Sequence, residues 1–159
     1  MEGTVRVMEY DGDRADVRWL FELAEDSARE LDGYLDLGRV LVAEEDGRRI
    51  GHLQLVGDEI KNMAVAEDRR GLGIGAALIR AAVGIAAHDG RRTIEVATGA
   101  ADVGNLRFYQ RQGFRMRSVE RDVFTPANGY PAGIMVDGIE LRDRVWLDLD
   151  VHPDVQPDP

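Results

Sequence analysis

The sequence predicts a single α/β domain whose mixed, mainly antiparallel sheet is flanked by helices, in the order β-α-α-β-β-β-α-β-α-β-β. Apolar residues switch repeatedly between the two-residue spacing of strands and the spacing of helices. An early Asp-Gly dipeptide separates two apolar runs, as in a tight hairpin. One long apolar helix joins two strands in mid-chain, which is typical of a parallel crossover.

The first third of the chain predicts one strand followed by two helices. Alternating apolar residues mark a strand over residues 4–10. Over residues 14–26 the apolar residues recur at helical spacing, and residues 28–35 form a shorter amphipathic helix. These helices are expected to lay their apolar faces on the sheet.

The centre of the chain predicts a hairpin, a strand and the crossover helix. Residues 39–57 contain two strands that meet at Asp46-Gly47, a dipeptide that tolerates positive φ in a tight turn. Residues 59–65 form the next strand. The helix over residues 73–88 is apolar nearly all round, so it is expected to lie flat on the sheet.

The last third predicts strands over residues 91–98, 114–124 and 139–151, with a helix over residues 103–112 that ends at Gly113. Five apolar residues of the final strand share one parity, as a half-buried strand requires: Ile139, Leu141, Val145, Leu147 and Leu149.

Length and terminal composition predict the domain bounds. At 159 residues, 44% of them hydrophobic, the chain is long enough for one packed domain, which we expect over residues 1–150. Residues 151–159 carry three prolines and are expected to form a flexible tail. The N-terminal segment lacks the regions of a signal peptide, and no run approaches the roughly 18 to 20 apolar residues of a membrane span. We therefore expect a cytoplasmic protein that does not bind membranes.

Composition also disfavours several functions. Without cysteine, the chain has no disulfide, thiolate metal site or cysteine nucleophile. Ser27 and Ser118 lie outside a G-x-S-x-G motif, which disfavours a serine hydrolase. His88 and His152 are too far apart to suggest a metal site. The net charge of −10 disfavours nucleic-acid binding and suits either a cationic partner or simple solubility.

A glycine-rich loop precedes the crossover helix. In residues 70–76, RGLGIGA, alternating glycines let the backbone close on a ligand, and the helix N-terminus offers free N–H groups with partial positive charge. Phosphates would fit there, with Arg70 adding a full charge. The loop lacks the Gly-Lys-Ser/Thr of a Walker A motif and the spacing of the G-x-G-x-x-G dinucleotide fingerprint. A glycine-rich turn packed closely against the sheet is the alternative.

Two segments in this order resemble the GNAT superfamily of acetyl-CoA-dependent N-acetyltransferases, with most similarity to small bacterial members. The family's pyrophosphate loop, Arg/Gln-x-x-Gly-x-Gly/Ala, corresponds to residues 70–75. A second family segment corresponds to Asn105, Tyr109 and Gly113-Phe114. The resemblance implies a GNAT-like fold, and acetyl-CoA as a cosubstrate. It implies that acetyl-CoA is bound by Met63, Ala64, Val65, Arg70, Gly71, Leu72, Gly73, Ile74, Gly75, Ala76, Asn105 and Tyr109, with main-chain pairing to the pantetheine arm at the first three.

Direct transfer of an acetyl group needs a neutral amine, a polarised carbonyl and a proton for the leaving thiolate. The resemblance implies that Tyr109 is the general acid; the alternative is a tyrosine ring packed under the crossover. Asn105 would bond the pantetheine arm or cap its helix. An amine with a pKa near 10 is neutral in about one molecule in a thousand at pH 7, so a base helps. Glu59 resembles the glutamate base of some members, or is an ordinary solvated strand-end carboxylate. His52 is a weaker candidate for the base.

The family resemblance places acceptor recognition in the first two helices and in a late loop. Acidic residues there would bind a small cation such as a polyamine or an aminoglycoside-like amine, and Tyr130 and Trp146 would form an aromatic wall. The candidate acids are Glu22, Glu25, Asp26, Asp137 and Asp143, although each also suits a solvated surface.

Three alternatives stay open at this point. The acceptor is instead a protein lysine or N-terminus, the chain is a non-catalytic acyl-CoA-binding module, or its acidic surface docks a basic protein. A homodimer is also plausible, because the final strands offer an open sheet edge.

Overall fold

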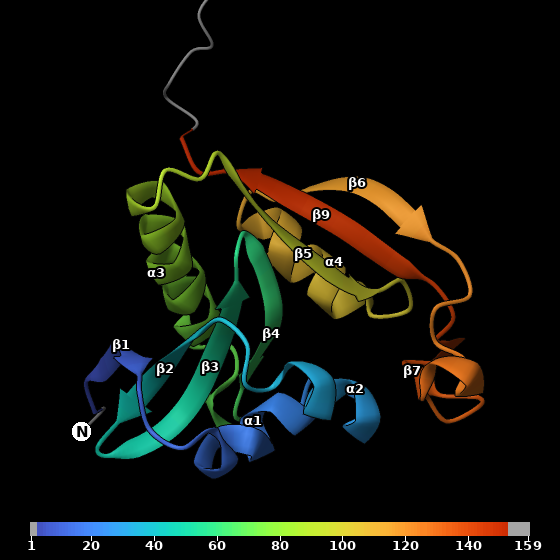
Figure 1. Cartoon of the computed structure of the whole chain (residues 1–159), viewed down its shortest axis with the longest axis horizontal. Coiled ribbons are helices and arrows are strands. Elements are labelled where there is room, and N and C mark those ends of the chain that lie inside the picture. The colour runs from blue at the N-terminus through green and yellow to red at the C-terminus, as the bar shows by residue number, and fades with distance from the viewer. Residues whose placement is uncertain (1–2, 153–159) are drawn as a thin grey trace, which may run out of the picture.

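Seven strands form one sheet in the order β1-β2-β3-β4-β5-β9-β6, and a short β7-β8 hairpin lies outside it (Figure 1). The computed structural model describes residues 3–152. The strands are β1 (Val5–Tyr10), β2 (Arg39–Glu45), β3 (Arg48–Val56), β4 (Glu59–Val65), β5 (Thr93–Gly99), β6 (Arg115–Glu120), β7 (Met135–Val136), β8 (Ile139–Glu140) and β9 (Arg144–Asp150). The helices are α1 (Arg18–Glu22), α2 (Ala28–Tyr34), α3 (Ile74–His88) and α4 (Val103–Arg111), with short 3-10 turns η1 (Arg14–Val17), η2 (Glu67–Arg69) and η3 (Pro126–Asn128).

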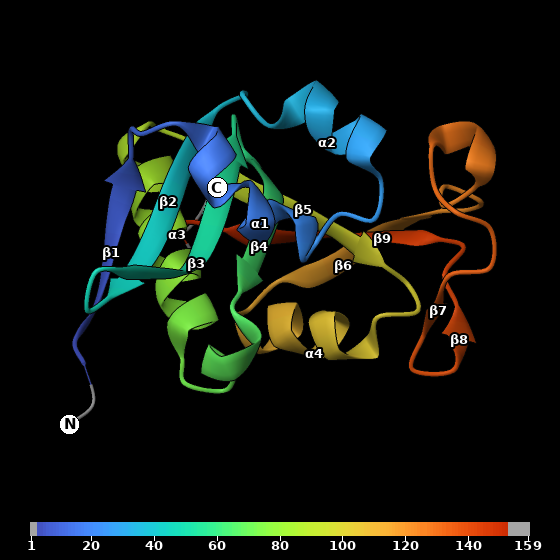
Figure 2. The same ribbon diagram turned by 90° about the horizontal axis from the view of Figure 1, so that it is seen from below.

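The predicted element order is confirmed, including the parallel crossover. Strands β4 and β5 are parallel and are joined through α3, while every other strand pairing in the described residues is antiparallel. Figure 2 shows α1 and α2 on one side of the sheet and α3 and α4 on the other. The sheet is therefore covered on both faces at β2 and β3, whereas every residue of β6 is exposed.

The apolar run of strand β2 is buried on both faces of the sheet. Successive side chains of a strand point to opposite faces. Leu41 and Ala43 belong to the core cluster that includes α3, whereas Val40 and Val42 belong to the cluster that includes α1 and α2. A strand buried on both faces reads as a continuous apolar run.

Three predicted elements differ from the structure by more than two residues at one end. The helix expected over residues 14–26 is a 3-10 turn followed by the five-residue α1, because the backbone at Val17 leaves the helical region with φ −115° and ψ 3°. The strand expected over residues 114–124 ends at Glu120, shortly before Asp122 at φ 59°.

The strand expected over residues 139–151 is also divided. Positive φ at Asp137 and Gly138 makes the tight β7-β8 turn, and β9 begins only at Arg144. Ile139 therefore lies in β8 and is 49% exposed. The prediction that it shares the buried face of the final strand is wrong.

The C-terminal end of the described chain is tied to the domain. Val151 is buried, and its N–H donates to the Arg92 carbonyl oxygen over 3.0 Å. The rest of the predicted tail, residues 153–159, lies outside the described residues. Within residues 3–152 no helix is long and apolar enough to cross a membrane.

Two irregularities of β4 prepare the site. Gln54 of β3 pairs with Asn62 and Leu55 pairs with Ile60, so Lys61 is an extra residue on β4, a β-bulge. Toward β5, pairing covers only two residues at the start of β4, Glu59 and Ile60. Beyond them the two parallel strands diverge, as Figure 1 shows.

Candidate active site

A cleft of about 1190 Å³ opens where β4 and β5 diverge. The glycine-rich loop and the first turn of α3 line one end, and α4 lines a side. The segment between α1 and α2 and residues from the stretch 124–146 line the other end. Segments that are far apart in the sequence, each predicted to contribute to the site, thus line one cleft.

The glycines of the loop serve different purposes. Gly71 and Gly73 have φ of +77° and +83°, and apart from their chain neighbours no described residue comes within 4 Å of a Cβ built on either one. Backbone conformation rather than close packing on the sheet therefore requires glycine there, which disfavours the packing alternative. Gly75 differs, because a Cβ there would lie 3.0 Å from Cζ of Phe108 on α4.

The N-terminus of α3 faces the cleft without a side-chain cap. Gly73 is its N-cap, and Ile74, Gly75 and Ala76 of the first turn line the cleft. Helix geometry leaves the first N–H groups without acceptors inside the helix, so they carry partial positive charge. Arg70 is exposed and its Nε donates to the Val65 carbonyl oxygen over 3.1 Å. This end of the cleft suits an anion.

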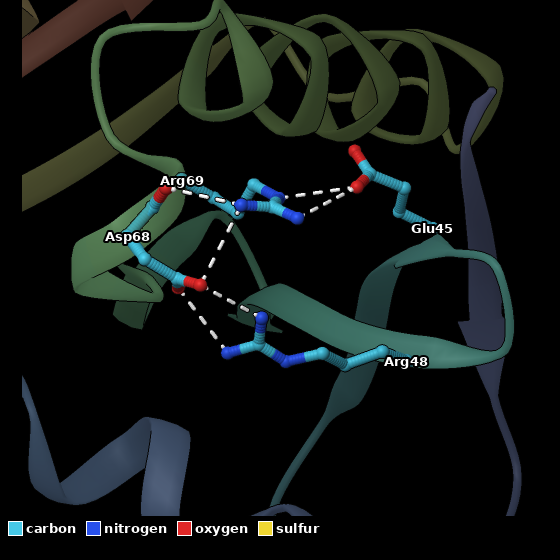
Figure 3. A network of polar contacts seen from close by, with 4 residues as sticks. All are labelled: Glu45, Arg48, Asp68 and Arg69. Carbon is cyan, nitrogen blue, oxygen red and sulfur yellow. Dashed lines mark hydrogen bonds and ion pairs between the residues drawn. The ribbon is translucent and has the colours of Figure 1, made fainter. Parts of the chain in front are cut away.

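Four charged residues fix the segment that leads into this loop (Figure 3). Arg48 of β3 makes two hydrogen bonds to the Asp68 carboxylate, at 2.9 and 3.2 Å. Arg69 donates from Nε to Glu45 Oε1 over 3.1 Å and lies 3.5 Å from Asp68. The network joins η2 to the β2-β3 hairpin, and so holds the entrance of the loop in place.

The β4 backbone presents a half-paired strand to the cleft. Met63, Ala64 and Val65 pair with β3 on one side and line the cleft on the other. In the described register, β5 does not pair with these three residues. An extended ligand is able to add to this edge as a strand would.

At the N-terminus of α4, the alternative that Asn105 caps this helix is wrong. The Asp102 carboxylate accepts from the Asn105 N–H over 2.9 Å, so Asp102 is the N-cap and Asn105 is not. The Asn105 side chain instead donates to Thr98 Oγ1 of β5 over 3.3 Å and lines the cleft. It therefore bridges α4 and β5 beside the cleft.

Tyr109 of α4 is packed and also reaches the cleft. Its ring makes edge contacts with Phe108 and Phe114, at centroid distances of 5.2 and 5.7 Å, and is 6% exposed. Within residues 3–152 its hydroxyl makes no hydrogen bond. Burial, and secondly the Asp102 charge, raise the pKa of Tyr109. The phenol is therefore protonated at neutral pH.

Glu59 opens β4 at the narrow end of the diverging strands. It is half-buried, and the Nζ of Lys61 lies 4.0 Å from its Oε2. Burial raises the pKa of the Glu59 carboxyl, while the Lys61 charge opposes that rise. Both residues line the cleft.

A chain of hydrogen bonds runs from the core to the far end of the cleft. His52 Nε2 and Asn62 Oδ1 are 2.8 Å apart, and Asn62 Nδ2 donates to the Tyr34 hydroxyl over 2.9 Å. The Tyr34 hydroxyl donates in turn to Glu25 Oε1 over 3.0 Å. His52 is fully buried, and burial lowers its pKa to about 4, so it is a neutral core residue that does not itself line the cleft.

Some of the predicted acceptor residues line the cleft and others do not. Glu25, Asp26, Tyr130 and Trp146 line the cleft. Burial and the Glu25 carboxylate raise the pKa of the Tyr130 phenol. The other three predicted acids lie away from the described cleft wall: Glu22 pairs with Arg18, Asp143 accepts from the Asp122 N–H, and Asp137 occupies the β7-β8 turn.

Several cleft residues are absent from the sequence predictions. Aromatic and basic side chains join the wall from distant segments, and no local pattern marks them. They are Tyr34, Lys61, Phe108, Phe124 and Arg144. In the described part of the chain, no group of three or more His, Asp or Glu side chains is placed to hold a metal ion.

Comparisons with known proteins agree with this geometry. Residues 36–116 match the acetyltransferase (GNAT) domain family. The chain is 34% identical over 137 residues to the uncharacterized N-acetyltransferase YvbK of Bacillus subtilis, covering 83% of this chain and 87% of that one. A B. subtilis acetyltransferase structure in complex with CoA superposes with a TM-score of 0.83 at 31% identity, over 92% of this chain and 99% of that chain. A GNAT family acetyltransferase from Elizabethkingia anophelis with acetyl-CoA bound gives 0.81 at 28% identity, over 92% and 97%.

Proposed function

The chain belongs to the GNAT family of acetyl-CoA-dependent N-acetyltransferases, and we propose that it acetylates a primary amine of a small cationic molecule, polyamine or aminoglycoside-like, directly within a ternary complex. The observation that carries this proposal is the cleft itself. It joins an anion-binding loop at one end to carboxylates and aromatic rings at the other. The half-paired edge of β4 runs between the two ends.

The residues at the loop end fit the phosphates of CoA. Gly71 and Gly73 leave open space above a backbone held at positive φ, and the first turn of α3 adds unpaired N–H donors. In the proposal, Arg70 and the main chain of residues 71–76 hold the pyrophosphate, with Leu72 exposed at the rim. The free edge of Met63, Ala64 and Val65 pairs with the pantetheine arm, and Asn105 bonds the same arm from α4.

Acetyl-CoA supplies an acetyl thioester to this arrangement. Glu59 would take a proton from the acceptor ammonium, a role that its raised pKa favours, because a more basic carboxylate removes a proton more readily. Tyr109 would give a proton to the departing sulfur, which is consistent with a phenol that stays protonated at neutral pH. Both side chains line the same cleft, so one substrate complex is able to reach both.

The far end of the cleft supports a cationic acceptor. Tyr34 holds the Glu25 carboxylate at 3.0 Å, and Asp26 adds a second acidic side chain. Tyr130 and Trp146 also line this cleft, and aromatic rings attract cations, as Arg144 beside the Trp146 ring illustrates. We assign these residues to recognition of an ammonium group that does not react.

A homodimer is part of the proposal, and the open edge that would serve it is β6, one of the two final strands of the sheet. The final strand β9 lies between β5 and β6, so the free edge at that side of the sheet is β6. Met116 and Val119 of β6 are more than half exposed. Light scattering at several protein concentrations would detect the dimer, and a monomer throughout would exclude it.

The acceptor class is tested by following thiol release with a panel of amines. Polyamines and aminoglycosides are expected to react, and Glu25→Gln is expected to raise their KM about tenfold by removing a charge-assisted contact. Glu22→Gln, on a neighbouring acid outside the cleft wall, is the matched control. Faster reaction with lysine peptides or protein N-termini than with any small amine would replace this acceptor with a polypeptide.

A further inference from the structure

Lys61 is the only lysine in the sequence. The other 19 of the 20 lysine and arginine residues are arginines. A guanidinium is a poor acyl acceptor because it stays protonated, whereas a lysine amine becomes a nucleophile when it loses its proton. Apart from the N-terminus, this one side chain is therefore the only primary amine that the polypeptide offers.

That amine lies in the candidate active site. Lys61 is the extra residue of the β4 bulge and lines the cleft. Its Nζ is 4.0 Å from Glu59 Oε2 and 4.9 Å from the centroid of the Tyr34 ring. Its side chain keeps 33% of its surface exposed. It thus occupies the kind of surroundings expected for an acceptor amine, a carboxylate on one side and an aromatic face on the other.

The direction of the cleft places the thioester near the same residue. The anion-binding loop follows the C-terminal end of β4, and the free edge of Met63–Val65 comes next along the cleft. A cofactor laid along this edge, with its phosphates at the loop, extends its acyl end back toward Asn62 and Lys61. This step rests on the proposed cofactor site.

We propose that Lys61 Nζ is itself an acetyl acceptor, so that the enzyme acetylates its own cleft. The Lys61 ammonium gives one proton to Glu59, and the free amine attacks the thioester carbonyl carbon. The N–C bond forms and the C–S bond breaks. The nitrogen loses its second proton to solvent, and the thiolate takes a proton from Tyr109, which solvent restores. The products are a neutral acetamide on Lys61 and free CoA.

The modification would change the charge of the acceptor end. An acetylated Lys61 no longer places a cation beside Glu59 and over the Tyr34 ring. A cationic acceptor would then meet one cation fewer beside the acidic and aromatic groups of that end, where Arg144 remains. We therefore expect Lys61→Gln, a neutral imitation of the acetylated side chain, to bind cationic acceptors more tightly than Lys61→Arg does.

The test incubates the full-length protein with acetyl-CoA, or with CoA as a control, and follows its intact mass. Peptide mapping with a protease that does not cut at lysine then locates the adduct. One acetyl group is expected on Lys61, at a rate that saturates with acetyl-CoA and does not depend on protein concentration. Lys61→Arg should show no internal adduct, and Tyr109→Phe should slow the reaction about tenfold or more.

A parallel thermal-shift titration separates this proposal from the proposed function. If acetyl-CoA stabilises the protein but Lys61 stays unmodified, the Lys61 proposal fails and the cofactor site stands. An adduct only at the N-terminus, or a rate that never saturates or that rises with protein concentration, also overturns it. If acetyl-CoA causes no stabilisation, the proposed cofactor site fails and the Lys61 proposal fails with it.

Discussion

The Tyr34 hydroxyl donates a hydrogen bond to Glu25 Oε1 over 3.0 Å and accepts one from Asn62 Nδ2 over 2.9 Å. Tyr34, which belongs to α2, thereby connects Asn62 of β4 to the Glu25 carboxylate at the acceptor end of the cleft. Glu25 belongs to the segment between α1 and α2, and its carboxylate also accepts from the Ser27 N–H over 3.4 Å, so two contacts hold it.

Tyr34→Phe is expected to weaken acceptor binding more than it slows chemistry. Without the hydroxyl, Glu25 keeps the Ser27 N–H but loses its Tyr34 partner, so KM for a cationic amine should rise about threefold to tenfold with kcat little changed. The unfolding free energy should fall by about 1 kcal/mol. Tyr10→Phe, which removes an exposed hydroxyl bond to the Asp13 carbonyl, is the control. Equal KM values for the two variants would contradict the role given to Tyr34.

Tyr109→Phe tests the general acid. The ring contacts with Phe108 and Phe114 would remain, so the fold should persist while the proton donor is lost. We expect kcat to fall about 100-fold or more, with acetyl-CoA binding unchanged in a thermal-shift titration. A variant with nearly normal kcat would leave Tyr109 with a packing role only.

The pH dependence of the reaction tests Glu59. Because burial raises its pKa, the carboxyl should stay protonated to a higher pH than an exposed glutamate does. As a base it acts only when ionised, so kcat/KM should fall on the acid side as Glu59 becomes protonated. Glu59→Gln should lower kcat/KM about 100-fold and abolish that acid limb. Glu67→Gln, on the exposed η2, is the control. An unchanged acid limb in Glu59→Gln would assign it to another group.

The buried His52 side chain is expected to make the unfolding free energy depend on pH. Its pKa of about 4 in the folded protein lies below the ordinary value of 6.5, so between these two values the unfolded chain binds more protons. Unfolding free energy should therefore decrease as the pH falls through this window, by up to about 3 kcal/mol. Chemical denaturation of His52→Gln should show a smaller decrease, while His88→Gln at the end of α3 should follow the wild type. Parallel curves for the wild type and His52→Gln would refute this explanation.

Local patterns predicted those parts of the molecule that short-range geometry determines. The Asp46-Gly47 turn has φ of 51° and 80° in the structure, and the glycine-rich loop leads into α3 as its sequence indicates. The dipeptide Asp137-Gly138 carries the same signal and makes the β7-β8 turn, which the predicted element order does not include. These features depend on residues that are neighbours in the chain.

Features that depend on distant pairing were not predictable in this way. Nothing near Lys61 marks it as a bulge, because the register with β3 creates it. The insertion of β9 between β5 and β6 is likewise a long-range pairing. The contact of Asn62 with Tyr34 joins β4 to α2 across 28 positions of the chain. For these reasons the glycine-rich loop was predictable from sequence, whereas at the acceptor end Tyr34 and Lys61 were not, although Glu25, Asp26, Tyr130 and Trp146 were.

Thermal unfolding with and without acetyl-CoA, on the wild type, Gly73→Glu and Gly84→Glu, tests the central claim most directly. Both glycines have open space for a Cβ, but Gly73 caps α3 in the cleft, whereas Gly84 lies on an exposed face of α3. At a concentration 100 times the dissociation constant, ligand should stabilise the wild type and Gly84→Glu by about 2.7 kcal/mol. Gly73→Glu should gain nothing, because its carboxylate opposes the phosphates. Equal stabilisation of both variants would contradict a cofactor site at this loop.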